Sequence, residues 1–147
     1  MNPVVIKTIL IVDDDYDDLL IFFDAVSEID ARLQCKAMSN GFDAMRSLSA
    51  NQSVLPDLIF LDMNMPKLTG KAFLSEIKQS VNLQHIPVII YTSSRFQKDI
   101  DDTRKLGAAY YLNKPNGYLK LKTALREILS LNMQSAFQGA GEGRYIL

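Results

Sequence analysis

Five aspartates crowd into six positions where an apolar run ends, in the stretch TILIVDDDYDDLL at residues 8–20. Neighbouring carboxylates repel one another, so such a cluster is tolerated when it is well solvated or when a cation neutralises it. Carboxylate oxygens are hard ligands of the kind that Mg²⁺ prefers. The cluster therefore predicts a cation site, if other suitable side chains meet it. Its members are Asp13, Asp14, Asp15, Asp17 and Asp18.

Polar side chains also follow other short apolar runs. Asp62 comes directly after one run, Thr92 after the next, and Lys114 closely follows the last. Mg²⁺ commonly keeps several waters and binds one or two carboxylates together with the phosphate oxygens of a substrate. Carboxylates, a hydroxyl and an ammonium group that meet at one place are therefore suited to the chemistry of a phosphorylated ligand.

Three other interpretations of the aspartate cluster are weaker. Helix capping and dipole compensation alone would explain the charges without a metal, but not the polar residues after the other runs. A calcium-binding loop fails because Asp18 stands where its sharp turn needs glycine. A dinucleotide site would need a glycine-rich loop, and the aspartates would repel a pyrophosphate. We expect Asp15, Asp17 and Asp18 in the first turn of a helix, and Asp13 and Asp14 on the cation.

Short apolar runs alternate with amphipathic stretches five times along the chain. Strand followed by helix, repeated in this way, predicts an α/β, doubly wound fold with right-handed crossovers and helices on both faces of a parallel sheet. Ligands of such sheets bind beyond the carboxyl ends of the strands, where the polar residues above lie. The predicted strands cover residues 9–12, 33–38, 58–61, 88–91 and 110–112, and the helical patterns cover 19–29, 42–48, 72–77, 96–106 and 121–128.

Composition restricts the class of protein. With 147 residues, 48% of them apolar, and a net charge of -1, the chain fits one globular domain. Its 16 basic and 17 acidic residues form no basic run, so nothing predicts nucleic-acid binding. No apolar run reaches the roughly 20 residues of a membrane helix. The lone Cys35 and an N-terminus unlike a secretory signal predict a cytoplasmic protein.

Four blocks, LIVDD, PDLIFLDMNMPKLTG, IIYTSS and AAYYLNKP, resemble the signature blocks of the response-regulator receiver domain, the phosphoacceptor module of two-component signalling. The resemblance covers about residues 7–131 and implies a flavodoxin-like (βα)5 fold with strand order 2-1-3-4-5. Residues 132–147 are expected to form a disordered tail with no output domain, so that any output comes through protein contacts.

The resemblance implies a role for each matching residue. Asp62 corresponds to the phosphoacceptor, and Thr92 and Lys114 correspond to the hydroxyl and the amine that contact the phosphoryl group. Tyr111 corresponds to the aromatic switch that turns inward with Thr92, although it could equally be a half-buried strand tyrosine. The bond between Lys114 and Pro115 is expected to be cis.

The Mg²⁺ ligands implied by the resemblance are Asp14 directly, Asp13 through water, Asp62, and the backbone carbonyl of Asn64. Asn64 and Ser94 lie where the family tunes access of water to the phosphoryl group. Because both are small and polar, we expect the aspartyl phosphate to hydrolyse within seconds to minutes.

The resemblance implies a single-domain response regulator in a histidine-to-aspartate phosphorelay. Its expected phosphate donor is a sensor histidine kinase or a phosphotransfer protein. Its expected output surface is the fourth helix, fifth strand and fifth helix, which contact a downstream protein or a second copy in a phosphorylation-dependent homodimer. The chain would be no enzyme beyond its own phosphorylation and dephosphorylation. A phosphohydrolase of the haloacid-dehalogenase type would need an aspartate where Asn64 stands, and a receiver that needs no phosphate would not require the acidic residues, Thr92 and Lys114.

Overall fold

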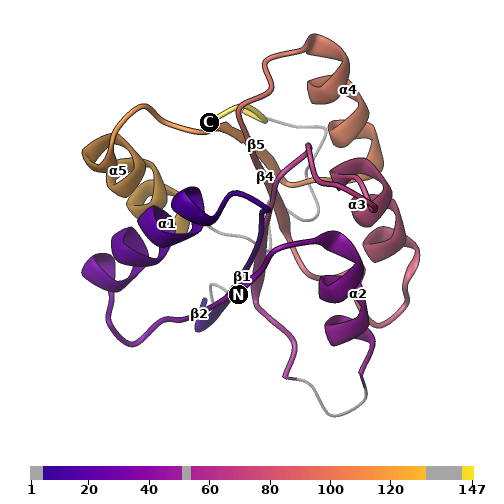
Figure 1. The fold of residues 1–147 in the computed structure, drawn as a ribbon, viewed down its shortest axis with the longest axis horizontal. Helices are drawn as coiled ribbons and strands as arrows, with labels where there is room; N and C mark the ends of the chain where they lie inside the picture. Colours follow the sequence, from indigo (N-terminus) through magenta and orange to yellow (C-terminus); the bar gives the residue numbers. More distant parts are fainter. Residues whose placement is uncertain (1–4, 51–53, 132–143) are drawn as a thin grey trace.

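The protein forms one five-stranded parallel sheet with helices on both faces (Figure 1). The computed structural model describes residues 5–50, 54–131 and 144–147. Its strand order is β2-β1-β3-β4-β5, which confirms both the predicted fold class and the predicted order. The strands are β1 (Thr8–Val12), β2 (Gln34–Met38), β3 (Leu58–Leu61), β4 (Val88–Thr92) and β5 (Tyr110–Asn113).

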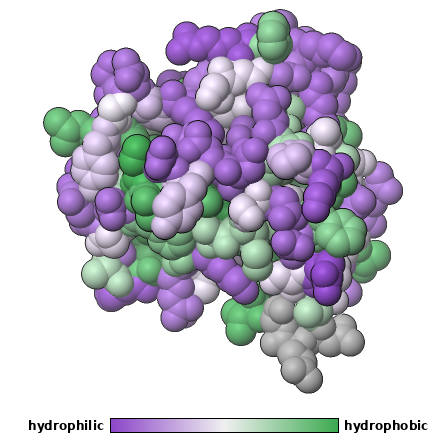
Figure 2. Space-filling model, in the orientation of Figure 1, coloured by the Kyte–Doolittle hydropathy of each residue, from purple (hydrophilic) through white to green (hydrophobic). Residues whose placement is uncertain are grey.

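Helices α1 and α5 lie on one face of the sheet, and α2, α3 and α4 lie on the other (Figure 1). The face seen in Figure 2 is largely hydrophilic over the helices, as expected for amphipathic helices that bury one side. Each predicted helical pattern falls in a helix of the structure, except that Phe96 is the N-cap of α4 and not part of it, so the alternation of strand and helix is confirmed. The helices are α1 (Tyr16–Ile29), α2 (Gly41–Ser49), α3 (Gly70–Gln79), α4 (Gln97–Leu106) and α5 (Tyr118–Leu129).

Strands β1, β3 and β4 form the centre of the sheet, and β3 and β4 are buried at every position. Continuous apolar runs are typical of strands covered on both faces. On the α1 side, Phe22 packs edge-on against Phe60 with their ring centroids 4.9 Å apart, and Tyr91 lies 5.6 Å from Phe22. This aromatic packing fixes α1 against β3 and β4, and thus sets the position of the aspartates at the start of α1.

Local capping explains where three of the helices begin. Asp15 accepts a hydrogen bond from the backbone of Asp18, Asn40 from that of Asp43, and Thr69 from that of Ala72. A side-chain oxygen at this position satisfies a backbone N–H that has no partner within the helix. The predicted place of Asp17 and Asp18 in the first turn of α1 is confirmed.

The last described residues depart from the expectation of a disordered tail. Arg144–Leu147 lie along β5, and Tyr111 forms a parallel bridge with Ile146. The side chain of Tyr145 is buried. The expectation is wrong for this segment because the aromatic side chain finds a place to pack, which composition alone does not reveal. Residues 132–143, the rest of the predicted tail, lie outside the described residues.

Candidate functional site

Three carboxylates meet at the carboxyl ends of β1 and β3. Asp13 and Asp14 follow β1, Asp62 follows β3, and each offers an oxygen within 4.8 Å of the others. Asp13 is fully buried and Asp62 is 6% exposed, whereas Asp14 faces solvent. Parallel strands end at the same edge of the sheet, so Asp62 becomes a neighbour of Asp13 and Asp14, which lie 49 and 48 positions before it in the chain.

The donor set suits a hard divalent cation. Asp13 uses Oδ1 to accept a hydrogen bond of 2.9 Å from the backbone of Asp15, while its buried Oδ2 lies 2.8 Å from the ammonium of Lys114. A buried carboxylate is costly unless positive charge lies beside it, and an ammonium group or a metal ion can supply that charge. Burial raises the pKa of Asp13 to about 6, and the nearby ammonium of Lys114 limits that rise.

The amine of Lys114 lies among the carboxylates. Its Nζ is 2.8 Å from Asp13 Oδ2, 2.7 Å from Asp18 Oδ2 and 3.6 Å from Asp62 Oδ2. Burial alone would lower the pKa of Lys114, but these carboxylates hold it above its ordinary value. The ammonium therefore stays charged at neutral pH and places a positive charge beside Asp62.

Asp18 belongs to this site, although the sequence predicts only helix capping and dipole compensation for it. Of the three carboxylates around the Lys114 amine, that of Asp18 lies nearest to it, at 2.7 Å. The sequence signal for this position is only that Asp18 belongs to the same aspartate cluster as Asp13 and Asp14. The partner itself comes from residue 114, and no local pattern predicts a contact across 96 positions.

Thr92 is the last residue of β4 and is fully buried. It lies at the same carboxyl-end edge of the sheet as the three carboxylates. Its Oγ1 accepts a hydrogen bond of 3.3 Å from the backbone of Ser94. Asn113 donates its side-chain amide to the carbonyl of Ser94 at 2.7 Å, so β5 supports the loop that follows β4. The hydroxyl is thus held on a loop whose position depends on neighbouring strands.

Tyr111 is already buried in this structure, so an inward turn does not start from an exposed ring. Its hydroxyl donates a 2.8 Å hydrogen bond to the carbonyl of Ser94. The alternative of a half-buried strand tyrosine therefore does not describe this ring. The switching role of Tyr111 stays a prediction.

Two further expectations meet a different structure. No described peptide bond is cis, so the bond between Lys114 and Pro115 is trans and the predicted cis bond is wrong. Trans is the more stable isomer of such bonds by about 0.5–1 kcal/mol, and the Lys114 amine reaches the carboxylates with it. Asn64 is exposed as expected, but Ser94 is buried and donates its hydroxyl to Asp99 at 2.5 Å.

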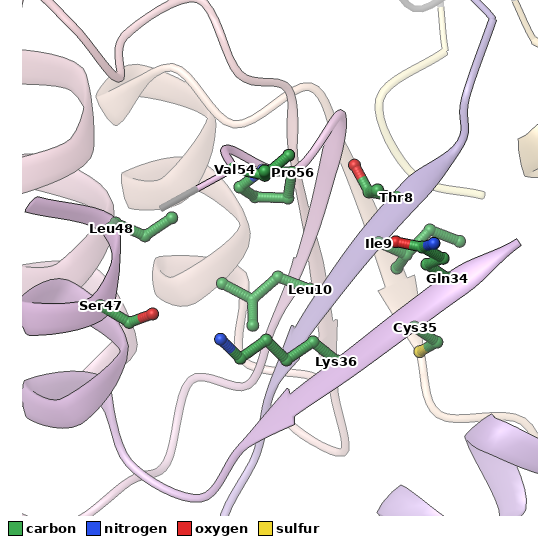
Figure 3. Close-up of a pocket in the computed structure, with 10 residues that line it drawn as sticks. All are labelled: Thr8, Ile9, Leu10, Gln34, Cys35, Lys36, Ser47, Leu48, Val54 and Pro56. Carbon is green, nitrogen blue, oxygen red and sulfur yellow. The ribbon is translucent and has the colours of Figure 1, made fainter. Parts of the chain in front are cut away.

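A cavity of about 360 Å³ lies elsewhere, between β1, β2 and α2 (Figure 3). Thr8 and Gln34, the first residues of β1 and β2, line it. It therefore opens toward the amino ends of these strands, whereas the carboxylates follow the carboxyl ends. The cavity is not part of the acidic site.

The sequence and the fold both match known proteins. Residues 9–126 match the family model of the response regulator receiver domain. The chain belongs to the receiver-domain family. The response regulator Rcp1 of Synechocystis sp. is 32% identical over 112 residues, which cover 74% of this chain and 76% of Rcp1.

Solved structures of receiver domains have the same fold. The Mn²⁺-bound form of Rcp1 aligns with a TM-score of 0.77 at 30% identity, over 85% of this chain and 93% of that one. The phosphorylated cyanobacterial phytochrome response regulator RcpA aligns with a TM-score of 0.80 at 27% identity, over 88% and 95%. The receiver-domain prediction and the flavodoxin-like fold are confirmed. Among the described helices, none is long and apolar enough to cross a membrane.

Proposed function

We propose that this receiver domain accepts a phosphoryl group on Asp62 from a sensor histidine kinase or a phosphotransfer protein, and that Mg²⁺ is its cofactor. The observation that carries the proposal is the ammonium of Lys114, 3.6 Å from the carboxylate of Asp62. Both a carboxylate and a phosphorylated donor are negatively charged, so they repel each other unless positive charge lies between them. Lys114 supplies one such charge.

Asp13, Asp14, Asp62 and the backbone carbonyl of Asn64 would hold the Mg²⁺ ion. When bound, the ion neutralises phosphate oxygens and favours in-line displacement. The Mn²⁺-bound structure of Rcp1 supports a divalent cation in a related protein. Here the carboxylates of Asp13, Asp14 and Asp62, with oxygens within 4.8 Å of one another, provide the matching donor set.

Lys114 and Thr92 would follow the charge that the phosphoryl group brings. A phosphorylated Asp62 carries more negative charge and more acceptor oxygens than a carboxylate. The ammonium of Lys114 can then leave Asp18 for the phosphoryl oxygens, a shift that needs little displacement because Asp62 is already 3.6 Å away. The hydroxyl of Thr92 would donate to the same group, and the loop that carries Ser94 would move with it.

The signal would leave through the surface of α4, β5 and α5. Phe96, which precedes α4, and Leu119, in α5, are each 76% exposed. Exposed large apolar side chains favour contact with a protein partner. We assign this surface to a downstream protein, or to a second copy of the chain when Asp62 is phosphorylated. We assign residues 7–131 to the receiver domain and residues 132–147 to a C-terminal extension, and we place the protein in the cytoplasm.

Labelling with acetyl phosphate tests the proposal. The full chain should form a base-labile phosphoprotein when Mg²⁺ is present, and EDTA should abolish the label. Asp62→Asn should give no label, while Asp57→Asn, a variant of an aspartate that bonds Lys7 and Thr8 away from the site, should be labelled normally. Equal labelling of wild type and Asp62→Asn would refute the assignment. Turnover of phosphate esters would favour a phosphohydrolase instead.

A further inference from the structure

The segment Arg144–Leu147 pairs with the outer edge of β5. Tyr111 donates its backbone N–H to the carbonyl of Tyr145, and Leu147 donates its N–H to the carbonyl of Tyr111, each at 2.9 Å. Strand β5 is the last of the sheet, and an edge strand presents N–H and C=O groups that another extended segment can pair with. Figure 1 shows this end of the chain beside β5. Both outward-facing backbone groups of Tyr111 are therefore occupied.

Tyr145 anchors the segment against α4. Its side chain is 5% exposed, and its hydroxyl lies 2.7 Å from the hydroxyl of Thr103, which is itself fully buried. The guanidinium of Arg104 lies 5.6 Å from the centre of the Tyr145 ring, a distance suited to a cation–π contact. A buried tyrosine with a satisfied hydroxyl stabilises its position by both area and hydrogen bonding. The side chain of Ile146, by contrast, is 45% exposed.

Tyr111 joins this anchor to the loop after β4. The rings of Tyr111 and Tyr145 lie 6.2 Å apart, within the range of favourable aromatic pairs. On its other side, Tyr111 donates its hydroxyl to the Ser94 carbonyl, and the Ser94 N–H in turn bonds the hydroxyl of Thr92. A continuous series of contacts therefore runs from Tyr145 through Tyr111 and Ser94 to Thr92.

We infer that the edge of β5, together with Thr103 and Arg104, is a binding site for an extended peptide segment that carries a tyrosine. Arg144–Leu147 of the same chain fills this site, and occupancy of the site keeps Tyr111 buried. The coupling to phosphorylation rests on the proposed function, with Asp62 as the phosphoacceptor, and on the switch role that the family resemblance implies for Tyr111, whose ring turns inward with Thr92. Since the segment favours the same position, phosphorylation and occupancy of the β5 edge strengthen each other, and this effect is reciprocal.

Amide hydrogen exchange in the full chain tests the site itself. Tyr145→Ala removes the anchor and should speed exchange of the Tyr111 and Leu147 amides at least tenfold. Ile146→Ala, which trims an exposed side chain of the same segment, should change both rates less than twofold. Unchanged exchange in Tyr145→Ala would overturn the inference. Protection in the wild type should not vary over a tenfold dilution, and protection that is lost on dilution would assign the segment to a second copy instead.

A peptide added in trans tests the kind of ligand. A synthetic GRYIL peptide should slow exchange of the Tyr111 amide in the Tyr145→Ala chain, because the weakened segment leaves the edge open to it. A GRAIL peptide, which lacks the tyrosine, should have at least tenfold less effect at the same concentration. An equal effect of the two peptides, or no effect of either, would overturn the tyrosine-binding site.

Beryllofluoride with Mg²⁺ tests the coupling. It should slow exchange of the Leu147 amide at least twofold, and Tyr145→Ala should weaken beryllofluoride binding by a similar factor. If the amides next to Asp62 do not respond to beryllofluoride, the proposed function fails. If they respond while the Leu147 amide does not, the coupling fails and the proposed function stands.

Discussion

Gly70→Ala should damage both stability and phosphorylation, because Gly70 packs directly against the backbone that carries Asp62. An alanine Cβ at this position would lie 2.5 Å from the carbonyl oxygen of Asp62 and 2.7 Å from the Cα of Met63. Both neighbours are backbone atoms, so no side-chain rotation relieves the contact. Gly70 needs no unusual backbone angle, and the substitution therefore tests space alone.

The geometry sets the expected size of the effect. The 2.5 Å contact is about 0.9 Å shorter than the 3.4 Å at which ordinary contact begins, so the loop after β3 has to shift by a comparable distance. Overpacking of this kind costs about 1–3 kcal/mol, and the better helix propensity of alanine returns up to about 1 kcal/mol. We expect a net loss of about 1–2 kcal/mol in the free energy of unfolding. A 1 Å displacement of a reacting group can lower a rate by about a hundredfold, so phosphorylation should suffer more than stability.

Urea unfolding and the initial rate of labelling by acetyl phosphate measure the two effects. Gly41→Ala is the matched control, since Gly41 also begins a helix but an alanine Cβ there would meet the Leu68 carbonyl at 3.1 Å, a milder contact that does not involve the backbone of Asp62. It should be nearly neutral in both assays. A Gly70→Ala protein with wild-type stability and a wild-type labelling rate would refute the reasoning, and an equal loss in both variants would assign the cost to the first helical position.

Three further predictions concern charge and the phosphoryl group. Asp18→Asn should raise the rate of labelling by acetyl phosphate, because the Lys114 ammonium then contacts only Asp13 and Asp62 among these carboxylates. The control Asp17→Asn should leave the rate unchanged. A lower rate in Asp18→Asn would instead show that Asp18 holds the amine in a productive position. Burial lowers the pKa of Lys78 from 10.5 to about 8. The unfolded chain then binds more protons between these values, so stability should rise with pH from about 8 to 10.5, by about 1 kcal/mol after allowance for partial exposure. Lys78→Met should remove that rise in chemical unfolding across this range, and an identical rise in the variant would contradict the assignment. In a label chase, the aspartyl phosphate should decay within seconds to minutes, and survival for many hours would exclude an accessible site.

Local patterns in the sequence account for most of the fold and for the main residues of the site. Continuous apolar runs identify β3 and β4 because both faces of these strands are covered. The same runs place Asp62 and Thr92, since ligand sites of parallel sheets lie just past the strand ends. Helix-capping rules place Asp15 at the start of α1 because a cap depends on residues within one turn.

Several contacts could not be predicted because each depends on residues distant in sequence. Nothing near Asp18 indicates that its carboxylate meets the Lys114 amine, and nothing near Tyr145 indicates that its hydroxyl meets Thr103. The residue type also leaves the choice of partner open, as Ser94 shows: the expected open polar position is buried and bonded to Asp99. For each of these side chains, several partners would be equally favourable locally, and the fold decides which one it meets.

The sequence by itself determined the alternation of strands and helices, and with it the edge at which Asp13, Asp62, Thr92 and Lys114 gather. Periodicity and capping act over a few residues, so they can be read without knowing the fold. Only the tertiary structure decided which carboxylates share the Lys114 ammonium and that Arg144–Leu147 close the edge of β5. Those outcomes depend on distances between segments far apart in the chain, which packing of the whole core establishes.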